Sequence, residues 1–291
     1  MIKMKELYKF TDLYKYYLES PLRSVKHSSY FLTYENLLSH YKNKQIIFVE
    51  VGIHNGGSLF MWKNFFGDNS RIIGIDLNPK AKELENYGFE IFIGNQSDST
   101  FWKEFYKSVG NIDVLLDDGG HTYEQQIITV YNSVDFINDG GMIIVEDTHT
   151  SYFKNFGYPS KYTFTKWAYK IADNINARSK KVNLRNPLFM DKVFSIEFFE
   201  SIVSFKIDRT KCFDSTPTSN ESETLNLEDY RYSKTKIETF LEKLIRFEKK
   251  YSSNVNRNLL LKILLKVNST IYIYIQNIFN KYRAFRLRKL F

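Results

Sequence analysis

The sequence contains one cysteine, Cys212, so no disulfide can form within the chain. This excludes a disulfide scaffold and agrees with a reducing compartment. Glycine and proline are also scarce, with 13 and 5 residues among 291, which excludes collagen-like and low-complexity chains. Aromatic residues are abundant instead, with 21 Tyr, 25 Phe and 3 Trp. Together with 43% hydrophobic residues, this length predicts a large, ring-rich core.

Long uncharged apolar stretches are missing as well. Charged side chains run through residues 1–20, so we expect no secretory signal. The most apolar stretch, 259–279, is interrupted by Lys262 and Lys266, so we expect no membrane-spanning helix. These features together predict a cytoplasmic protein.

Acidic residues are absent after Glu248. Ten of the 41 basic residues lie beyond it, which leaves 31 basic against 33 acidic residues in the rest of the chain. The net charge of +8 therefore belongs to the tail, and nucleic-acid binding by the body is disfavoured. Three interpretations of residues 249–291 remain open: an amphipathic segment on an anionic membrane surface, a nucleic-acid arm, or a homo-oligomerisation helix. We favour the first, which would make the protein peripheral to the inner face of the membrane.

Short β-branched runs alternate with amphipathic segments from residue 45 onward. The strands are predicted at 46–51, 71–76, 89–93, 112–117 and 142–146, and the helices between them at 58–66, 79–86, 99–108 and 123–137. This order predicts a Rossmann-like α/β fold with an open, doubly wound, mostly parallel sheet. Another helix is predicted at 163–177, and two strands within 193–207 would turn at Glu200 and Ser201 to add an antiparallel edge.

The chain is predicted to have four parts. Apolar residues recur at helical spacing within residues 1–44, which indicates an N-terminal lid or packing layer. The α/β domain would cover 45–208. Residues 209–230, rich in Ser, Thr, Asn and Glu, are expected to form a linker or mobile loop. Residues 231–291 would form a helical, basic extension.

Polar residues follow the first three predicted strands. After the first, Gly52, Gly56 and Ser58 lie in a turn that opens a helix, where a backbone can approach a ligand closely. Asp76 ends the second strand, about 20 residues later, where a carboxylate can accept both hydroxyls of a ribose. Asn95, Gln96 and Asp98 follow the third strand and are candidates for an adenine edge.

The glycine spacing is not G-x-G-x-x-G, which disfavours a pyrophosphate cofactor. Each motif alone could be an ordinary strand-end turn. Because the three motifs occur in this order and each follows the end of a strand, together they favour S-adenosylmethionine as the cofactor.

The fourth and fifth predicted strands end in acidic residues. Asp118, Glu146 and Asp147 would meet as three hard oxygen ligands suited to Mg²⁺. Clustered carboxylates repel one another, so a positive charge is expected among them. His121 would be the general base. The alternative is that Asp117 and Asp147 cap helices and that His121 lies in a surface loop.

These motifs resemble a known family. The segments EVGxxxGGSLxMW at 50–62, GID at 74–76, DDGGH at 117–121, and GGxxxxED with TSY within 140–152 are similar to class I methyltransferases that act on sugar hydroxyls. The resemblance is to macrolide sugar O-methyltransferases of the mycinamicin type, and to proteins labelled cephalosporin hydroxylase or rhamnosyl O-methyltransferase. It covers about residues 45–207.

The resemblance implies three groups of site residues. Asp118, Glu146 and Asp147 would hold Mg²⁺, and His121 would be the base. The residues implied around S-adenosylmethionine are Glu50, Gly52, Ser58, Asp76 and Asp117. Family members often have Asp where this chain has Asn95. His149 and Tyr152 are candidates for contact with the sugar, although a histidine in such a loop can equally serve as a hydrogen-bonding residue.

The predicted function is Mg²⁺-dependent transfer of a methyl group from S-adenosylmethionine to a sugar hydroxyl. The acceptor would be a surface polysaccharide, a lipid-linked glycan or a glycosylated natural product. Two alternatives stay open: a nucleic-acid methyltransferase, and a non-catalytic cofactor-binding scaffold or hydroxylase-type partner. No two of the five prolines are adjacent, so the Asn/Asp-Pro-Pro-aromatic motif of amino methylation is absent.

Overall fold

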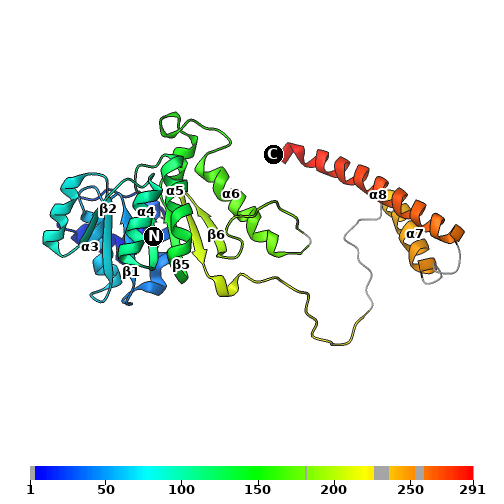
Figure 1. Ribbon diagram of the computed structural model, residues 1–291, viewed down its shortest axis with the longest axis horizontal. Coiled ribbons are helices and arrows are strands. Elements are labelled where there is room, and N and C mark those ends of the chain that lie inside the picture. Colours follow the sequence, from blue (N-terminus) through cyan, green and yellow to red (C-terminus); the bar gives the residue numbers. More distant parts are fainter. Residues whose placement is uncertain (1–3, 181, 226–235, 253–258, 291) are drawn as a thin grey trace. The chain divides into compact units, whose positions relative to one another are not determined.

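A computed structural model describes residues 4–180, 182–225, 236–252 and 259–290. The chain divides into two compact units, Met1–Pro217 and Thr218–Phe291. Figure 1 shows the first as a sheet covered by helices and the second as a pair of helices. The predicted end of the linker at residue 230 lies outside the described residues.

The larger unit contains a seven-stranded sheet in the order β3-β2-β1-β4-β5-β7-β6. The strands are β1 (Ile47–Val51), β2 (Arg71–Asp76), β3 (Glu90–Ile93), β4 (Ile112–Asp117), β5 (Ile137–Val145), β6 (Val193–Phe199) and β7 (Ile202–Ile207). Strands β1 to β5 pair in parallel, whereas β7 runs antiparallel to β5 and β6. The predicted doubly wound sheet with an antiparallel edge is therefore confirmed. The strand order reverses between β1 and β4, where such sheets bind ligands.

Helices connect the parallel strands, and the first three of them begin shortly after a strand ends. They are α3 (Gly57–Phe66), α4 (Ser99–Val109), α5 (Tyr123–Ser133) and, after β5, α6 (Phe164–Ile175). Thr122 and Gln125 form a capping box that begins α5. The short loop between β4 and this box therefore has little freedom, which matters because it carries Asp118 and His121.

Two predicted elements differ in the structure. The segment predicted as a helix at 79–86 is a 3-10 helix, Pro79–Tyr87, whose buried residues Ala81 and Leu84 have the three-residue spacing of that helix. Helix α5 ends at Ser133, and β5 begins at Ile137 rather than at 142. The sequence did not predict the start of β5, because this part of the strand is polar and includes Gly140. In the structure Gly140 has φ +86°, and the register with β4 shifts here.

The sheet is buried on both faces, which explains its continuous apolar strands. Alternate residues of β1 point to different sides: Phe48 packs in one hydrophobic cluster and Val49 in the other. The N-terminal helices α1 (Asp12–Glu19) and α2 (Ser28–Leu38) contribute to the first cluster with α3. Tyr34 of α2 contacts Trp62 of α3 edge to face, with ring centroids 5.1 Å apart. These helices are a packing layer of the domain.

The smaller unit consists of α7 (Lys236–Tyr251) and α8 (Leu259–Leu287). They pack together around Leu241 and Leu265, and Asn268 Nδ2 donates to the Leu244 carbonyl at 3.0 Å. By length and composition, α8 could cross a membrane: its most apolar 18-residue window has a mean hydropathy of 1.2 and is 6% buried. The lysines of this segment therefore do not exclude a spanning helix, contrary to the sequence argument.

Candidate active site

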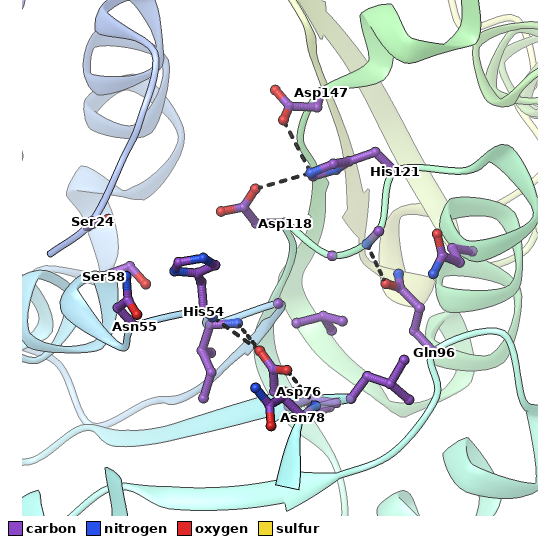
Figure 2. A pocket seen from close by; sticks show the side chains of 18 of the residues that line it. Ser24, His54, Asn55, Ser58, Asp76, Asn78, Gln96, Asp118, His121 and Asp147 are labelled. Atoms are coloured by element: carbon purple, nitrogen blue, oxygen red, sulfur yellow. Dashed lines mark hydrogen bonds and ion pairs between the residues drawn. The ribbon is translucent and has the colours of Figure 1, made fainter. Parts of the chain in front are cut away.

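A cavity of about 830 Å³ opens at the carboxyl ends of β1 to β4. Its lining includes the turn after β1, the end of β2, the loop after β3 and the loop after β4 (Figure 2). Arg23, Ser24 and Val25, from the segment between α1 and α2, form part of the wall. Sequence reasoning did not place these three residues at the site, because the segment has no periodicity or motif.

The turn after β1 approaches the loop after β4 closely. Gly52 has φ +82°, and a Cβ atom there would lie 2.2 Å from the Asp118 carbonyl oxygen. Only glycine permits this contact. Gly56 begins α3 at φ +80° but is not among the cavity-lining residues, whereas Ser58 is.

Asp76 holds the turn after β1 in place. Its Oδ2 accepts hydrogen bonds from the backbone N–H groups of Ile53 and His54, both at 3.1 Å. Its Oδ1 accepts from the Asn78 N–H at 2.8 Å (Figure 2). Both lone pairs of Oδ2 are engaged by these N–H groups, but Oδ1 has one left, so the carboxylate can still accept from a hydroxyl of a bound nucleoside.

The candidate residues after β3 have two different positions. Asn95 and Gln96 line the cavity, whereas Asp98 lies outside it and caps α4 through the Thr100 N–H. Gln96 is buried and joins two loops: its Nε2 donates to Asp117 Oδ1 at 2.9 Å, and its Oε1 accepts from the Gly120 N–H at 2.9 Å. Gln96 thereby orders the loop after β4 as well as the cavity wall.

Glu50 and Asp117 are completely buried and are not among the cavity-lining residues. Burial raises the pKa of both carboxyls. Glu50 Oε2 accepts from the Ser58 hydroxyl at 2.6 Å, which fixes a side chain that does line the cavity. Asp117 accepts from Gln96 and from the Gly119 N–H, and makes no helix cap.

Asp118, His121 and Asp147 meet at one end of the cavity (Figure 2). His121 Nε2 lies 3.3 Å from Asp147 Oδ2 and 3.9 Å from Asp118 Oδ1. One potential ligand atom from each residue lies within 4.8 Å of the others, a spacing that suits a metal ion. All three side chains are about four-fifths buried, so His121 is not a surface-loop residue, and Asp147 makes no capping hydrogen bond.

Glu146 lies next to this group but faces the protein interior. It is 1% exposed and does not line the cavity. Its Oε1 accepts from Lys26 Nζ at 3.0 Å and from the Tyr34 hydroxyl. The Tyr30 hydroxyl donates in the same way to Asp147 Oδ1. Lys26, Tyr30 and Tyr34 were not predicted from the sequence.

Lys26 Nζ also lies 2.6 Å from Asp118 Oδ2 and 3.4 Å from Glu50 Oε1. Burial alone would lower the pKa of Lys26, but the adjacent charges of Asp118 and Glu146 outweigh it, and the pKa is raised well above its usual value. The contacts of Lys26 also fix the preceding residues 23–25 in the cavity wall.

His149 and Tyr152 lie farther out. His149 Nδ1 is 3.9 Å from Asp147 Oδ1, and its ring lies near His27, with centroids 6.0 Å apart. Tyr152 is 65% exposed. Neither lines the cavity.

The strand order and the ligand cavity at the strand ends define a class I methyltransferase fold. Residues 49–148 match the family model described as a methyltransferase domain. The fold is similar to that of MycE, a methyltransferase of mycinamycin biosynthesis solved with Mg and SAH, with a TM-score of 0.61. That match has 22% identity and covers 68% of this chain and 54% of MycE.

Known relatives bear out the resemblance to sugar O-methyltransferases. The chain is 30% identical over 131 residues to demethylmacrocin O-methyltransferase of Streptomyces fradiae, covering 43% of this chain and 33% of that protein. It is 29% identical over 136 residues to 8-demethyl-8-alpha-L-rhamnosyl tetracenomycin-C 2'-O-methyltransferase of Streptomyces olivaceus, covering 44% and 35%. Mycinamicin VI 2''-O-methyltransferase of Micromonospora griseorubida is 28% identical over 131 residues, covering 43% of this chain and 32% of that protein. The chain thus matches about a third of the length of these relatives.

Proposed function

We propose that this protein transfers a methyl group from S-adenosylmethionine to a sugar hydroxyl with the help of Mg²⁺. The observation that carries the proposal is the shared cavity: nucleoside-type contacts at the ends of β1 and β2 face the same space as the Asp118, His121 and Asp147 group. The relatives named above are O-methyltransferases, several of them for glycosylated natural products.

The cofactor would lie along the turn after β1. In this proposal Asp76 accepts a hydrogen bond from a ribose hydroxyl, while Asn95 and Gln96 face the base. Gly52 has no side chain, so the turn after β1 can approach the loop after β4 closely beside the cofactor. A cavity of about 830 Å³ has room for the cofactor and part of an acceptor.

His121 would receive the acceptor proton at Nε2, which is the nitrogen that faces Asp118 and Asp147. Asp147 would stabilise the imidazolium that results, because its carboxylate can accept a hydrogen bond from the newly protonated Nε2. Asp118 and Asp147 would hold Mg²⁺, which when bound supplies the Lewis acid that lowers the pKa of a sugar hydroxyl. The deprotonated hydroxyl oxygen then forms a bond to the methyl carbon as the sulfonium sulfur leaves with the electron pair. Positioning of both substrates is the main contribution of the protein.

The acceptor is proposed to be a sugar on a lipid-linked glycan or surface polysaccharide. This choice rests on features of the C-terminal unit that suit a membrane surface. Helix α8 exposes an apolar stripe at helical spacing, in which Leu264, Val267, Ile271 and Ile278 are 40 to 52% exposed. The sequence of this helix has basic residues and no acidic ones. A second copy would bring the basic residues of two such helices together, whereas an anionic bilayer complements both the stripe and the charge.

Transfer of labelled methyl groups from S-adenosylmethionine tests the enzymatic proposal. We expect label in a glycan or lipid-linked glycan fraction, localised to a sugar oxygen by mass spectrometry and lost when EDTA removes divalent ions. Label in RNA or DNA would instead support the nucleic-acid methyltransferase. Cofactor binding without label in any fraction would support the scaffold.

Membrane docking is tested by sedimentation of the full chain with vesicles of phosphatidylglycerol or of phosphatidylcholine. We expect binding to the anionic vesicles, and its loss when Ile271→Asp and Ile278→Asp are combined. The matched control combines Thr270→Asp and Asn277→Asp, which add the same charge at exposed polar positions beside the stripe and should retain most binding. Equal sedimentation of the two double variants would contradict docking through the stripe, and vesicle-independent dimers would favour the oligomer.

A further inference from the structure

Arg23 is the one lysine or arginine among the described residues that line the cavity. The carboxylates of that lining are those of Asp76, Asp118 and Asp147. S-adenosylmethionine has two positive groups, the sulfonium and the ammonium of its methionine part, and one negative group, the carboxylate. Aspartates complement the two positive groups, so the carboxylate is best matched by the single basic side chain of the wall.

The segment that carries Arg23 is fixed against the start of α3. A Cβ atom on Gly57 would lie 2.7 Å from both the carbonyl carbon and the carbonyl oxygen of Arg23, so the two backbones are in close contact. The Ser20 hydroxyl donates to the Gly57 carbonyl at 2.8 Å. Three residues after Arg23, Lys26 Nζ donates to Asp118 Oδ2 at 2.6 Å. Arg23 therefore has a defined place on the wall, although its segment has no regular structure.

This place is at the methionine end of the proposed cofactor position. Asp76, Asn95 and Gln96, which would face the ribose and the base, follow β2 and β3. The segment of Arg23 leads instead to Lys26, which contacts residues at the ends of β1 and β4. Because the strands lie in the order β3-β2-β1-β4, a nucleoside at β2 and β3 directs the amino-acid part of the cofactor toward Arg23.

The guanidinium group of Arg23 can accept a ligand. The residue is exposed and, within the described part of the chain, makes no ion pair. Lys26, in contrast, is buried among carboxylates and does not line the cavity. A planar guanidinium group can donate two parallel hydrogen bonds to one carboxylate, which suits an amino-acid ligand.

We propose that Arg23 binds the carboxylate in the methionine part of S-adenosylmethionine and so selects cofactors that carry an amino acid. This inference rests on the function proposed above, in which the cofactor lies along the turn after β1. It makes the segment between α1 and α2 a part of the cofactor site. S-adenosylhomocysteine, which is left after methyl transfer, keeps the same carboxylate, so Arg23 would bind it in the same way.

The test compares S-adenosylmethionine with its decarboxylated form, which keeps the sulfonium and the ammonium and lacks only the carboxylate. In calorimetric titrations of the full chain, Arg23→Gln should bind S-adenosylmethionine about tenfold more weakly than wild type, because hydrogen bonds to a charged group are lost. Affinity for the decarboxylated form should stay the same or increase, since a positive charge is removed beside a doubly positive ligand. That second affinity also shows that the site of the variant is intact.

Two further variants are controls. Arg23→Lys keeps the charge without the planar fork and should lie between wild type and Arg23→Gln. Arg185→Gln removes an exposed arginine outside the cavity and should match wild type with both ligands.

The outcomes separate this inference from the function on which it rests. If wild type binds neither form, the cofactor-dependent function fails and the role of Arg23 fails with it. If wild type binds S-adenosylmethionine but Arg23→Gln has the same affinity, or loses affinity equally for both forms, only the role of Arg23 is overturned.

Discussion

His121 Nε2 lies 3.3 Å from Asp147 Oδ2, so the loops after β4 and β5 meet in one imidazole–carboxylate pair. The pair stands at the edge of the cavity that the turn after β1 and Asp76 also line. An imidazole held by a carboxylate is suited to accept a proton, because the carboxylate stabilises the positive charge that develops.

Replacing His121 therefore tests the proton acceptor. His121→Ala should lower methyl transfer by about 100-fold or more, the range typical of a lost general base, while S-adenosylmethionine affinity stays near wild type. The matched control is His40→Ala, an exposed histidine outside the cavity, which should retain wild-type turnover. Wild-type turnover in His121→Ala would remove that residue from the mechanism.

Asp76 has two roles in the account, because it fixes the turn after β1 and faces the cavity. Asp76→Ala should weaken S-adenosylmethionine binding about 10- to 100-fold, the value of one or two hydrogen bonds to a charged group. Titration calorimetry measures this directly. Asp68→Ala, at an exposed position outside the cavity, controls for loss of a carboxylate. Unchanged affinity in Asp76→Ala would place the ribose elsewhere.

Gly52 allows us to separate close approach from backbone strain. Gly52→Ala adds a Cβ that would lie 2.2 Å from the Asp118 carbonyl oxygen, whereas Gly88→Ala, at a similar φ of +86°, meets nothing within 4 Å. Both variants should lose about 1 kcal/mol from strain, and Gly52→Ala should lose a further 1 to 3 kcal/mol or so from overpacking. Denaturant unfolding compares them. Equal losses would contradict the close approach.

Asp139 gives a prediction for pH. Hydrogen bonds from the Arg209 backbone and guanidinium hold the pKa of Asp139 below its usual value. Because the folded-state pKa is the lower one, this pair contributes stability above the unfolded pKa and loses it as the pH falls through the folded pKa. Asp139→Asn should therefore lower the free energy of unfolding at neutral pH by less than about 1 kcal/mol, since both groups are partly exposed.

The pH dependence is the diagnostic part of that experiment. The difference between Asp139→Asn and wild type should shrink toward zero in the acid range below the usual pKa of an aspartate. Unfolding measured by urea at neutral and acid pH gives both values. A difference that grows on acidification would contradict the assigned direction.

The sequence predicted the sheet because its strands are buried on both faces and are read as nearly continuous apolar runs. It predicted that Asp118 and Asp147 approach each other because parallel strands end at the same edge. Asp98 was assigned to the cofactor, although an aspartate directly before a helical pattern is also a cap signal, and capping is its role in the structure.

The position of Lys26 among the carboxylates could not be predicted from the sequence. Repulsion among the carboxylates predicts a positive charge between them but does not say which residue supplies it. Lys26 is 24 residues from Glu50 and 120 from Glu146, and its segment has no periodicity or motif that would indicate these contacts. Such a pairing arises from tertiary structure, which a single sequence does not reveal.

The most direct test of the central claim is calorimetric titration of the full chain with S-adenosylmethionine, with and without Mg²⁺, repeated on Asp118→Ala. The account predicts micromolar cofactor binding by both proteins and a Mg²⁺ signal in wild type alone. Absence of cofactor binding by wild type under every condition would contradict it.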